Sequence, residues 1–428
     1  MTSLERELRD IIGARHVLAD PDVTMSYGTD WTGRWSTRPR LVIRPETVEE
    51  VVAVVKACAR HQSAIVPQGG NTGLVGGSVP RSSEEVILST ARLTMCETVD
   101  VATRQVTVGA GVSIRALQQH ARASGLLYGV DLASRDTATI GGTVATNAGG
   151  VRVVRYGDTR AQIAGIQAVL ADGSIVDRLA GLPKDSSGYD LNGLLVGSEG
   201  TLAVVTAVRV RLRPIEDGGE CVLVGCSSFA VALSLLPGRG VRAAEVMTSD
   251  GVALVREVAN LPRPLNGDWP VYLLMEVDKL DLLDLPDDVD AVVDSRVWEY
   301  RERQTEAVAT LGVPHKLDVA VPVARLDDFV AEVGTAVTSH KLVLWGHLAE
   351  GNLHVNVIGP DPDDYTIDHQ LLEIVAAYHG SISAEHGVGT AKSSQLHLSR
   401  SAAEIQAMRA IKSALDPQNI LNPGVIFS

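Results

Sequence analysis

The sequence predicts an α+β fold divided into two domains. Expected strands and helices alternate along the 428 residues with short connections. In the second half, hairpins join the strands in place of the long crossovers of parallel sheets, which favours a largely antiparallel sheet covered by helices. With 45% hydrophobic residues, a chain of this length can build two or three domains with sizeable cores.

The first half shows the clearest local patterns. Residues 1–36 predict a helical lead-in followed by a polar loop. Residues 46–62 predict an amphipathic helix, since Val51, Val54 and Val55 share one face. Residues 163–177 predict a hairpin with Asp172-Gly173 at its turn. The other expected elements are strands within 40–45, 64–68, 85–93, 101–112 and 200–214, and a helix within 113–125.

The second half alternates apolar strands with helices. We expect a helix from about Phe229 and another around residues 295–310. Strands are expected at 221–228 and 271–277, and a strand pair at 342–359.

Charge and cysteine content exclude several classes of protein. The net charge of −14 argues against nucleic acid as the main partner, so an anionic substrate needs a local cluster of positive charge. The four cysteines lack zinc-ribbon or disulfide-scaffold spacing, which fits a reducing cytosol. The N-terminus does not resemble a signal peptide, and no apolar run is long enough to span a bilayer. We therefore expect a cytoplasmic protein, with peripheral membrane contact left open.

Three glycine-rich segments stand out in the first half. Residues 66–80 place five glycines between Gly69 and Gly77, directly after an apolar strand. Bare backbone N–H groups of this kind can approach pyrophosphate oxygens, and a Gly/Asn turn is the alternative. Residues 139–160 and 194–206 repeat the pattern of apolar residues and glycines. Three such segments favour one long ligand, and a dinucleotide fits better than a mononucleotide.

These segments resemble the FAD-binding domain of the vanillyl-alcohol oxidase/p-cresol methylhydroxylase flavoprotein superfamily. The rest of the chain resembles the FAD-linked oxidase C-terminal domain, and the resemblance is strongest to the D-2-hydroxyacid dehydrogenases. It implies a lead-in at 1–36, a two-subdomain FAD-binding domain at 37–215, and a substrate and metal domain at 216–428. The last ~40 residues are expected to return to the FAD-binding domain.

The resemblance also implies which residues bind FAD. We expect non-covalent FAD, because the loop 67–80 contains no His or Cys that could link it. The expected cofactor residues lie in the three glycine segments and near the C-terminus: Pro67, Gly69, Gly70, Asn71, Thr72, Gly73, Gly76, Gly77, Ser78, Ile140, Gly141, Gly142, Ala145, Thr146, Asn147, Gly149, Gly150, Tyr156, Gly157, Glu199, Gly200 and Asn422.

Two histidines lie in the strand pair "WGHLAEGNLHVNV". A two-residue turn at Glu350-Gly351 pairs His347 directly with His354 on one sheet face, which Asn356 shares. Adjacent imidazoles repel when both are protonated, so the pair indicates either a metal site or a buried neutral pair.

The resemblance implies that His347, His354 and Glu385 bind a divalent metal, zinc in the first place, with manganese, cobalt or iron(II) as alternatives. It also implies that His386 is the general base. This chain departs from the family in the turn, where Ala349-Glu350 replaces the usual Gly-Asp, and at Val425, where a lysine is frequent.

An anion-binding group is expected from a charged helix and a nearby strand. Arg301 and Thr305 are spaced i, i+4, and Lys316 follows. A solvated helix face is the alternative. The resemblance aligns these three residues with substrate-carboxylate contacts, and we add Asn356 to the substrate-binding set. Arginine suits bidentate carboxylate binding.

The sequence as a whole predicts an FAD-dependent, metal-assisted dehydrogenase. A small D-2-hydroxy acid is oxidised to the 2-oxo acid by hydride transfer to flavin N5. An electron-transfer protein, quinone or cytochrome then accepts the electrons, and a homodimer is the oligomer considered. The alternatives are a metal-independent FAD oxidase of a sugar or other alcohol, and a non-redox binding protein that has lost flavin.

Overall fold

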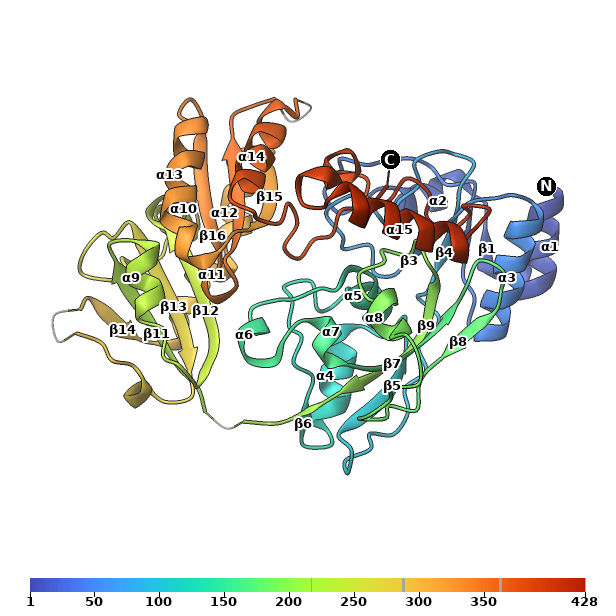
Figure 1. The fold of residues 1–428 in the computed structure, drawn as a ribbon, viewed down its shortest axis with the longest axis horizontal. Helices are drawn as coiled ribbons and strands as arrows, with labels where there is room; N and C mark the ends of the chain where they lie inside the picture. The colour runs from blue at the N-terminus through green and yellow to red at the C-terminus, as the bar shows by residue number, and fades with distance from the viewer. Residues whose placement is uncertain (217, 287–288, 362–363, 428) are drawn as a thin grey trace. The chain divides into compact units, whose positions relative to one another are not determined.

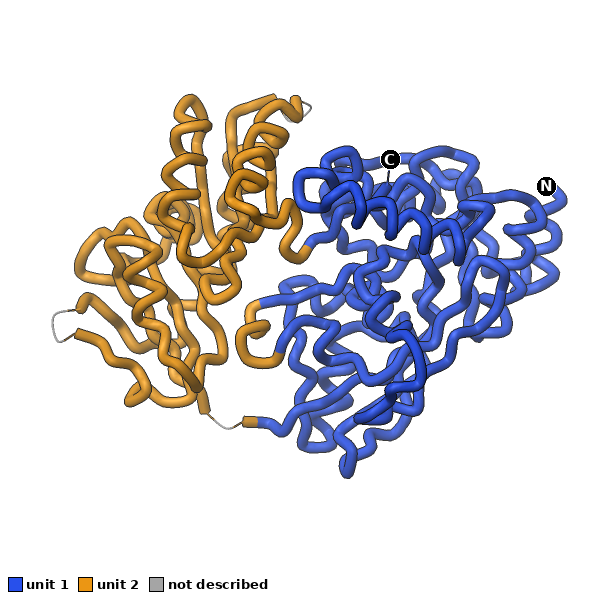
Figure 2. Tube along the Cα trace, viewed as in Figure 1, with its two compact units in different colours: residues 1–150, 157–215, 386–428 blue, residues 151–156, 216–385 orange. Residues whose placement is uncertain are grey.

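The computed structural model describes residues 1–216, 218–286, 289–361 and 364–427. Within them the chain divides into two compact units (Figure 2). The first unit contains residues 1–150, 157–215 and 386–428, and the second contains 151–156 and 216–385. The chain therefore contributes the short segment 151–156 to the second unit, returns to the first, builds the rest of the second, and returns to the first for its last segment.

The first unit contains a small, mostly parallel sheet with strand order β1-β2-β4-β3. Strands β2, β4 and β3 are parallel, and β1 pairs antiparallel with β2. The bounds are β1 (Val17–Leu18), β2 (Leu41–Ile43), β3 (Ile65–Gln68) and β4 (Val86–Ser89). The predicted amphipathic helix is confirmed as α3 (Val48–Arg60), which Thr47 caps at its N-terminus and whose Val51, Val54 and Val55 are buried.

A second sheet of this unit is antiparallel, with strand order β5-β9-β7-β8. The predicted hairpin is confirmed, since Val169 of β7 pairs with Ile175 of β8 and Gly173 lies in the turn at a φ of 81°. The strand bounds, including the short pair β6–β10, are β5 (Gln105–Gly109), β6 (Leu126–Leu127), β7 (Ile163–Val169), β8 (Ile175–Asp177), β9 (Val204–Arg211) and β10 (Arg213–Pro214).

One hydrophobic core joins the two sheets of the first unit and its helices. The C-terminal segment completes it: the backbone of Ile65 in β3 pairs with Ile420 and Asn422 through N–H to carbonyl bonds of 2.7 and 2.8 Å. The helices, with 3-10 turns marked η, are α1 (Ser3–Ile12), η1 (Ala14–His16), α2 (Pro21–Gly28), α4 (Ile114–Arg122), α5 (Ile140–Thr146), α7 (Thr159–Gln162), α8 (Leu191–Leu195), η6 (Ser393–Leu398) and α15 (Ala402–Leu415).

The second unit is built on a seven-stranded sheet in which all the paired strands run antiparallel (Figure 1). The predicted antiparallel sheet is therefore confirmed. The strands, in spatial order, are β14 (Ala291–Val293), β11 (Glu220–Cys226), β13 (Val271–Val277), β12 (Val241–Thr248), β16 (Lys341–His347), β17 (Asn352–Ile358) and β15 (His315–Ala320).

Helices pack on this sheet, and α10 lies against β12 and β16. The helices and turns are α6 (Val153–Tyr156), α9 (Phe229–Ser234), α10 (Ser249–Ala259), η2 (Leu280–Leu282), η3 (Ser295–Val297), α11 (Trp298–Glu302), α12 (Gln304–Ala309), η4 (Val323–Arg325), α13 (Leu326–Ala336), η5 (Leu348–Glu350) and α14 (Thr366–Ala377).

The helix expected around residues 295–310 is not continuous, which corrects the prediction. It is divided at Arg303, between α11 and α12. The side-chain amide of buried Gln304 donates to the carbonyl of Tyr300 at 2.9 Å, the acceptor that its own backbone N–H would use in a regular helix.

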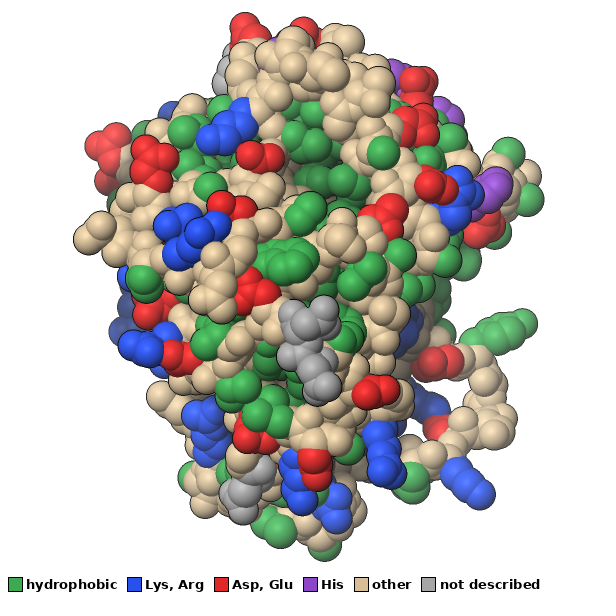
Figure 3. Space-filling model, turned by 90° about the vertical axis from the view of Figure 1, so that its left-hand side faces the viewer, with side chains coloured by type: hydrophobic (Ala, Val, Ile, Leu, Met, Phe, Trp, Pro, Cys, Tyr) green, Lys and Arg blue, Asp and Glu red, His purple; other side chains and the backbone are tan. Residues whose placement is uncertain are grey.

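The surface carries both signs of charge. Figure 3 shows acidic and basic side chains interspersed over one face, with no broad basic area among the residues drawn there. Among the described residues, no helix is long and apolar enough to cross a membrane.

Candidate functional site

The first two glycine segments touch each other in the first unit. The loop after β3 packs on residues 137–139, where α5 begins. A Cβ on Gly70 would lie 1.9 Å from the carbonyl oxygen of Thr137, and one on Gly69 would lie 2.3 Å from Oγ1 of Thr139. Only glycine permits this approach, so the two segments form a cradle with backbone groups in place of side chains.

The third glycine segment joins this cradle through Glu199. Its backbone N–H donates to the carbonyl of Ala145 at 2.8 Å. Asn422 donates from Nδ2 to the carbonyls of Gly77 at 2.8 Å and Glu199 at 2.7 Å. Residues predicted to bind the cofactor thus meet from all three segments and from the C-terminus.

The carboxylate of Glu199 holds the segment that follows His386. It accepts the backbone N–H groups of Val388 and Gly389, both at 2.7 Å. Burial raises the pKa of Glu199 to about 7, while these two hydrogen bonds act in the opposite direction.

Other predicted cofactor residues shape the same segments. Asn71 donates to the carbonyl of Thr29 and accepts from Ser78, each at 2.8 Å, which fixes the first loop. Asn147 ends α5 in the left-handed conformation. Tyr156 lies in the second unit, where its hydroxyl donates to Glu216. The remaining predicted residues lie on β3 or its loop (Pro67, Thr72, Gly73, Gly76), on α5 (Ile140, Gly141, Gly142, Ala145, Thr146), or in nearby turns (Gly149, Gly150, Gly157, Gly200).

The histidine strands pair in a different register from the one predicted. His347 of β16 lies opposite Asn352, and Trp345 lies opposite His354. The connection is therefore the four residues 348–351, a 3-10 turn ending at Gly351 with a φ of 65°, and not a two-residue turn. Because the shift is two residues, both histidines stay on one face as diagonal neighbours, with ring centroids 5.5 Å apart.

His347, His354 and Glu385 form a cluster within the second unit. One ligand atom from each lies within 4.8 Å of the others. Nε2 of His347 is 3.4 Å from Oε1 of Glu385, and a tetrahedral zinc with bonds of about 2.0–2.1 Å holds neighbouring ligand atoms about 3.3 Å apart. The spacing and the two-histidine, one-carboxylate donor set fit a divalent metal.

Two buried carboxylates that we did not predict lie next to the Nδ1 atoms of the two histidines. Oε1 of Glu245 lies 2.5 Å from Nδ1 of His347, and Oδ1 of Asp318 lies 3.5 Å from Nδ1 of His354. Both carboxylates are fully buried. A carboxylate flanked by apolar residues, as in "AAEVM" for Glu245 and "LDVAV" for Asp318, was the available signal.

The electrostatics of the cluster favour a positive charge. Burial acts to lower the pKa of His347, but the neighbouring Glu245 and Glu385 carboxylates raise it well above the usual value. Burial acts to raise the pKa of Glu385, and His347 lowers it below the usual value. A cation is therefore stabilised here, either as imidazolium or as a metal ion.

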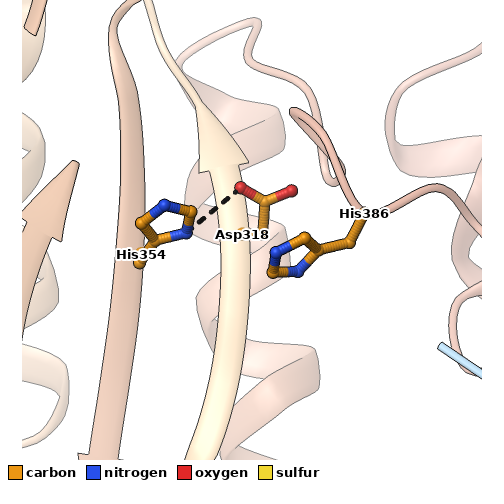
Figure 4. Close-up of side chains that lie close together, drawn as sticks. All are labelled: Asp318, His354 and His386. Atoms are coloured by element: carbon orange, nitrogen blue, oxygen red, sulfur yellow. Dashed lines mark ion pairs between the residues drawn. The ribbon is translucent and has the colours of Figure 1, made fainter. Parts of the chain in front are cut away.

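His386 lies at the edge of the same cluster. Figure 4 shows its side chain beside Asp318 and His354, with the His354–Asp318 ion pair dashed. One ligand atom from each of these three residues lies within 4.8 Å of the others. Both oxygens of Asp318 are already engaged, by Nδ2 of Asn352 at 2.8 Å and by the backbone N–H of Glu385 at 2.7 Å. Asp318 therefore orients its neighbours.

The predicted substrate residues are not all brought together. Lys316 of β15 lies opposite Asn356 of β17, two residues along the strands from the Asp318–His354 pair. Arg301 makes an ion pair with Glu245, Nε to Oε2, at 2.6 Å. Thr305 is exposed on α12, beyond the interruption at Arg303, so the predicted regular i, i+4 spacing from Arg301 is not formed.

The two departures from the family pattern have clear positions. Glu350 ends η5, and burial raises its pKa. Val425 is buried. Neither residue contributes an atom to the three-ligand cluster.

Comparison with known families matches both halves of the chain. The family described as FAD binding domain matches residues 39–178, and the family described as FAD linked oxidases, C-terminal domain, matches residues 219–426.

Curated relatives match over nearly the whole chain. A protein of Xanthomonas citri pv. viticola named D-2-hydroxyglutarate dehydrogenase is 36% identical over 456 aligned residues, covering 98% of this chain and 96% of that protein. A Bos taurus protein named D-2-hydroxyglutarate dehydrogenase, mitochondrial, is 35% identical, covering 95% of this chain and 80% of that protein.

Solved structures share the fold at lower identity. p-Cresol methylhydroxylase with substrate bound aligns with a TM-score of 0.80 at 17% identity, covering 98% of this chain and 95% of that chain. Alkyldihydroxyacetonephosphate synthase aligns with a TM-score of 0.77 at 16% identity, covering 98% and 84%. The p-cresol methylhydroxylase type of fold expected from the sequence is confirmed.

Proposed function

Because the chain belongs to the FAD-linked oxidase family that includes the D-2-hydroxyglutarate dehydrogenases, we propose that it oxidises a D-2-hydroxy acid to the corresponding 2-oxo acid. The chain is an FAD-dependent oxidoreductase. The names of its relatives make D-2-hydroxyglutarate the first substrate to test, ahead of D-lactate and D-malate.

The observation that carries this proposal is the cluster of His347, His354 and Glu385. Two imidazoles and one carboxylate leave a coordination position open for substrate, as in catalytic and unlike closed structural sites. A metal-independent oxidase of a sugar has no need of such a cluster.

Most of the predicted residues have a proposed role. When bound, FAD supplies the acceptor for the hydride from C2, and a divalent metal supplies a Lewis acid for the 2-hydroxyl. His386 accepts the hydroxyl proton. Arg301 and Lys316 bind oxygen atoms of the substrate carboxylate, and Asn356 lines the same region. Thr305, on the separate helix α12, is left without a role in this arrangement. The glycine segments and Glu199 hold the cofactor.

A substrate screen tests the proposal. The purified protein is mixed anaerobically with D-2-hydroxyglutarate, D-lactate, D-malate or glycolate, with the L-enantiomers of the chiral acids, and with a sugar and an aldonolactone. Flavin bleaching is followed first, then turnover with an artificial electron acceptor. We expect bleaching with at least one D-2-hydroxy acid and none with its L-enantiomer. Bleaching only by sugars or aldonolactones contradicts the proposal.

A further inference from the structure

We propose that Glu245 is a positioning residue that fixes the ring orientation and tautomer of His347 and so sets the metal affinity of the cluster. This inference rests on the proposed function, because it concerns the same metal.

Glu245 is held on both of its oxygens. It lies on β12 directly opposite His347 of β16 and is fully buried. Oε1 is 2.5 Å from Nδ1 of His347, and Oε2 accepts from Nε of Arg301 at 2.6 Å. With one partner on each oxygen, the carboxylate has a single defined orientation.

That orientation decides which nitrogen of His347 can bind a metal. An ionised carboxylate only accepts hydrogen bonds, so Nδ1 must carry the proton that it shares with Glu245. The lone pair of the neutral ring then lies on Nε2, the nitrogen that is 3.4 Å from Glu385. A carboxylate behind a metal-binding histidine also makes the ring a stronger ligand.

The charges of the cluster agree with this role. Burying a lone carboxylate is costly, and Arg301 offsets the charge of Glu245. The carboxylates of Glu385 and Asp318 remain beside the two histidines, so the surroundings carry a net negative charge that suits a divalent cation.

A purely structural role is the competing explanation, in which Glu245 only neutralises Arg301 within the sheet. Glu276 provides a matched control for that explanation. It is a buried glutamate on the neighbouring strand β13, pairs with Arg152 and Arg242, and belongs to neither metal-binding group of the described residues.

The test compares zinc affinity in full-length, FAD-containing wild type, Glu245→Gln and Glu276→Gln. Each protein is stripped with a chelator and titrated with Zn²⁺ against a competing zinc dye. We expect the affinity of Glu245→Gln to fall by roughly 10–100-fold, and that of Glu276→Gln to stay at the wild-type level. Turnover of Glu245→Gln should recover as zinc is raised, whereas a structural defect would persist at every zinc concentration.

Wild-type affinity in Glu245→Gln overturns the inference and leaves the proposed function intact. If the wild type binds neither Zn²⁺ nor Mn²⁺, Co²⁺ or Fe²⁺, both the inference and the proposed metal site are contradicted, and this is recognised before any variant is made. If Glu245→Gln does not fold, Glu245→Asp replaces it: this variant keeps the charge for Arg301 but is one methylene too short for His347. It should also bind zinc more weakly, and unchanged affinity overturns the inference.

Discussion

Asp318 accepts the backbone N–H of Glu385 through Oδ2 at 2.7 Å, so a buried carboxylate of β15 fixes the backbone of a proposed metal ligand. Its other oxygen accepts from Asn352 and lies beside His354. The Asp318 side chain therefore helps to fix the position of the strand that carries His354 and of the segment that carries Glu385.

Replacing Asp318 with Asn should destabilise the second unit. The amide has only one acceptor oxygen, so either the buried Nδ2 of Asn352 or the partly buried N–H of Glu385 loses its partner, at a cost of about 1–3 kcal/mol. Urea unfolding followed by tryptophan fluorescence measures the change. Asp281→Asn, at an exposed position, is the control and should leave the midpoint unchanged. Equal midpoints for Asp318→Asn and wild type contradict the prediction.

The stability contribution of Glu199 should depend on pH. Its folded-state pKa of about 7 lies above the unfolded value of 4.5, so in this window the folded state keeps a proton that the unfolded state has lost. The contribution of Glu199 to the free energy of unfolding is fully present below about pH 4.5 and is lost as the pH rises to about 7. Relative to Glu199→Gln, the wild type should lose on the order of 3 kcal/mol across the window. Parallel profiles of unfolding free energy against pH for the two proteins would show that Glu199 is ionised throughout.

Replacing His386 with Ala should slow flavin reduction by roughly 10²–10⁴-fold, the usual contribution of a positioned base. Substrate binding should change less, because Arg301 and the metal cluster remain. Stopped-flow bleaching, paired with metal analysis of the same sample, measures both. A near-normal rate of bleaching would show that His386 is not the base. Loss of bound metal would show that His386 is a metal ligand.

Chelation should abolish turnover and leave the flavin spectrum largely unchanged. The proposed ligands lie in the second unit, whereas the glycine cradle lies in the first. Dialysis against a chelator, followed by an absorbance spectrum and a turnover assay, separates the two effects, and added Zn²⁺ should restore activity. Full activity of the metal-free enzyme contradicts the proposed site.

Acid precipitation should release the flavin into the supernatant, since the loop 67–80 offers no His or Cys for a covalent bond. Absorbance of the supernatant and of the redissolved pellet gives the partition. Yellow colour retained in the pellet shows a covalent attachment elsewhere.

Periodicity predicted those parts of the fold that local sequence determines. The buried face of α3 and the strand β13 followed from patterns of apolar residues. The register of β16 and β17 did not, because a tertiary contact selects the turn. A Cβ on Gly351 would lie 2.1 Å from the carbonyl of Val321, so the neighbouring strand end, and not the turn sequence alone, fixes the four-residue connection.

Glu245 shows the same limit within the site. It precedes His347 by 102 residues, and nothing in the local sequence links the two. Their pairing depends on β12 and β16 being neighbours in the sheet. By contrast, the sequence predicted His347, His354 and Glu385 as one group. The reason is that the family resemblance supplied this long-range contact, which the local sequence does not show.

The return of residues 386–428 to the first unit also determines which unit can be completed first during synthesis. The edge of β3 pairs with Ile420 and Asn422, so this unit lacks part of its framework until these residues have been synthesised. The residues of the second unit, by contrast, end at Glu385. Domains generally fold as units while the chain emerges, so the residues of the metal-binding unit are complete first and the flavin-binding unit requires residues 386–428 as well. A chain that terminates early should therefore keep a folded second unit while failing to retain flavin.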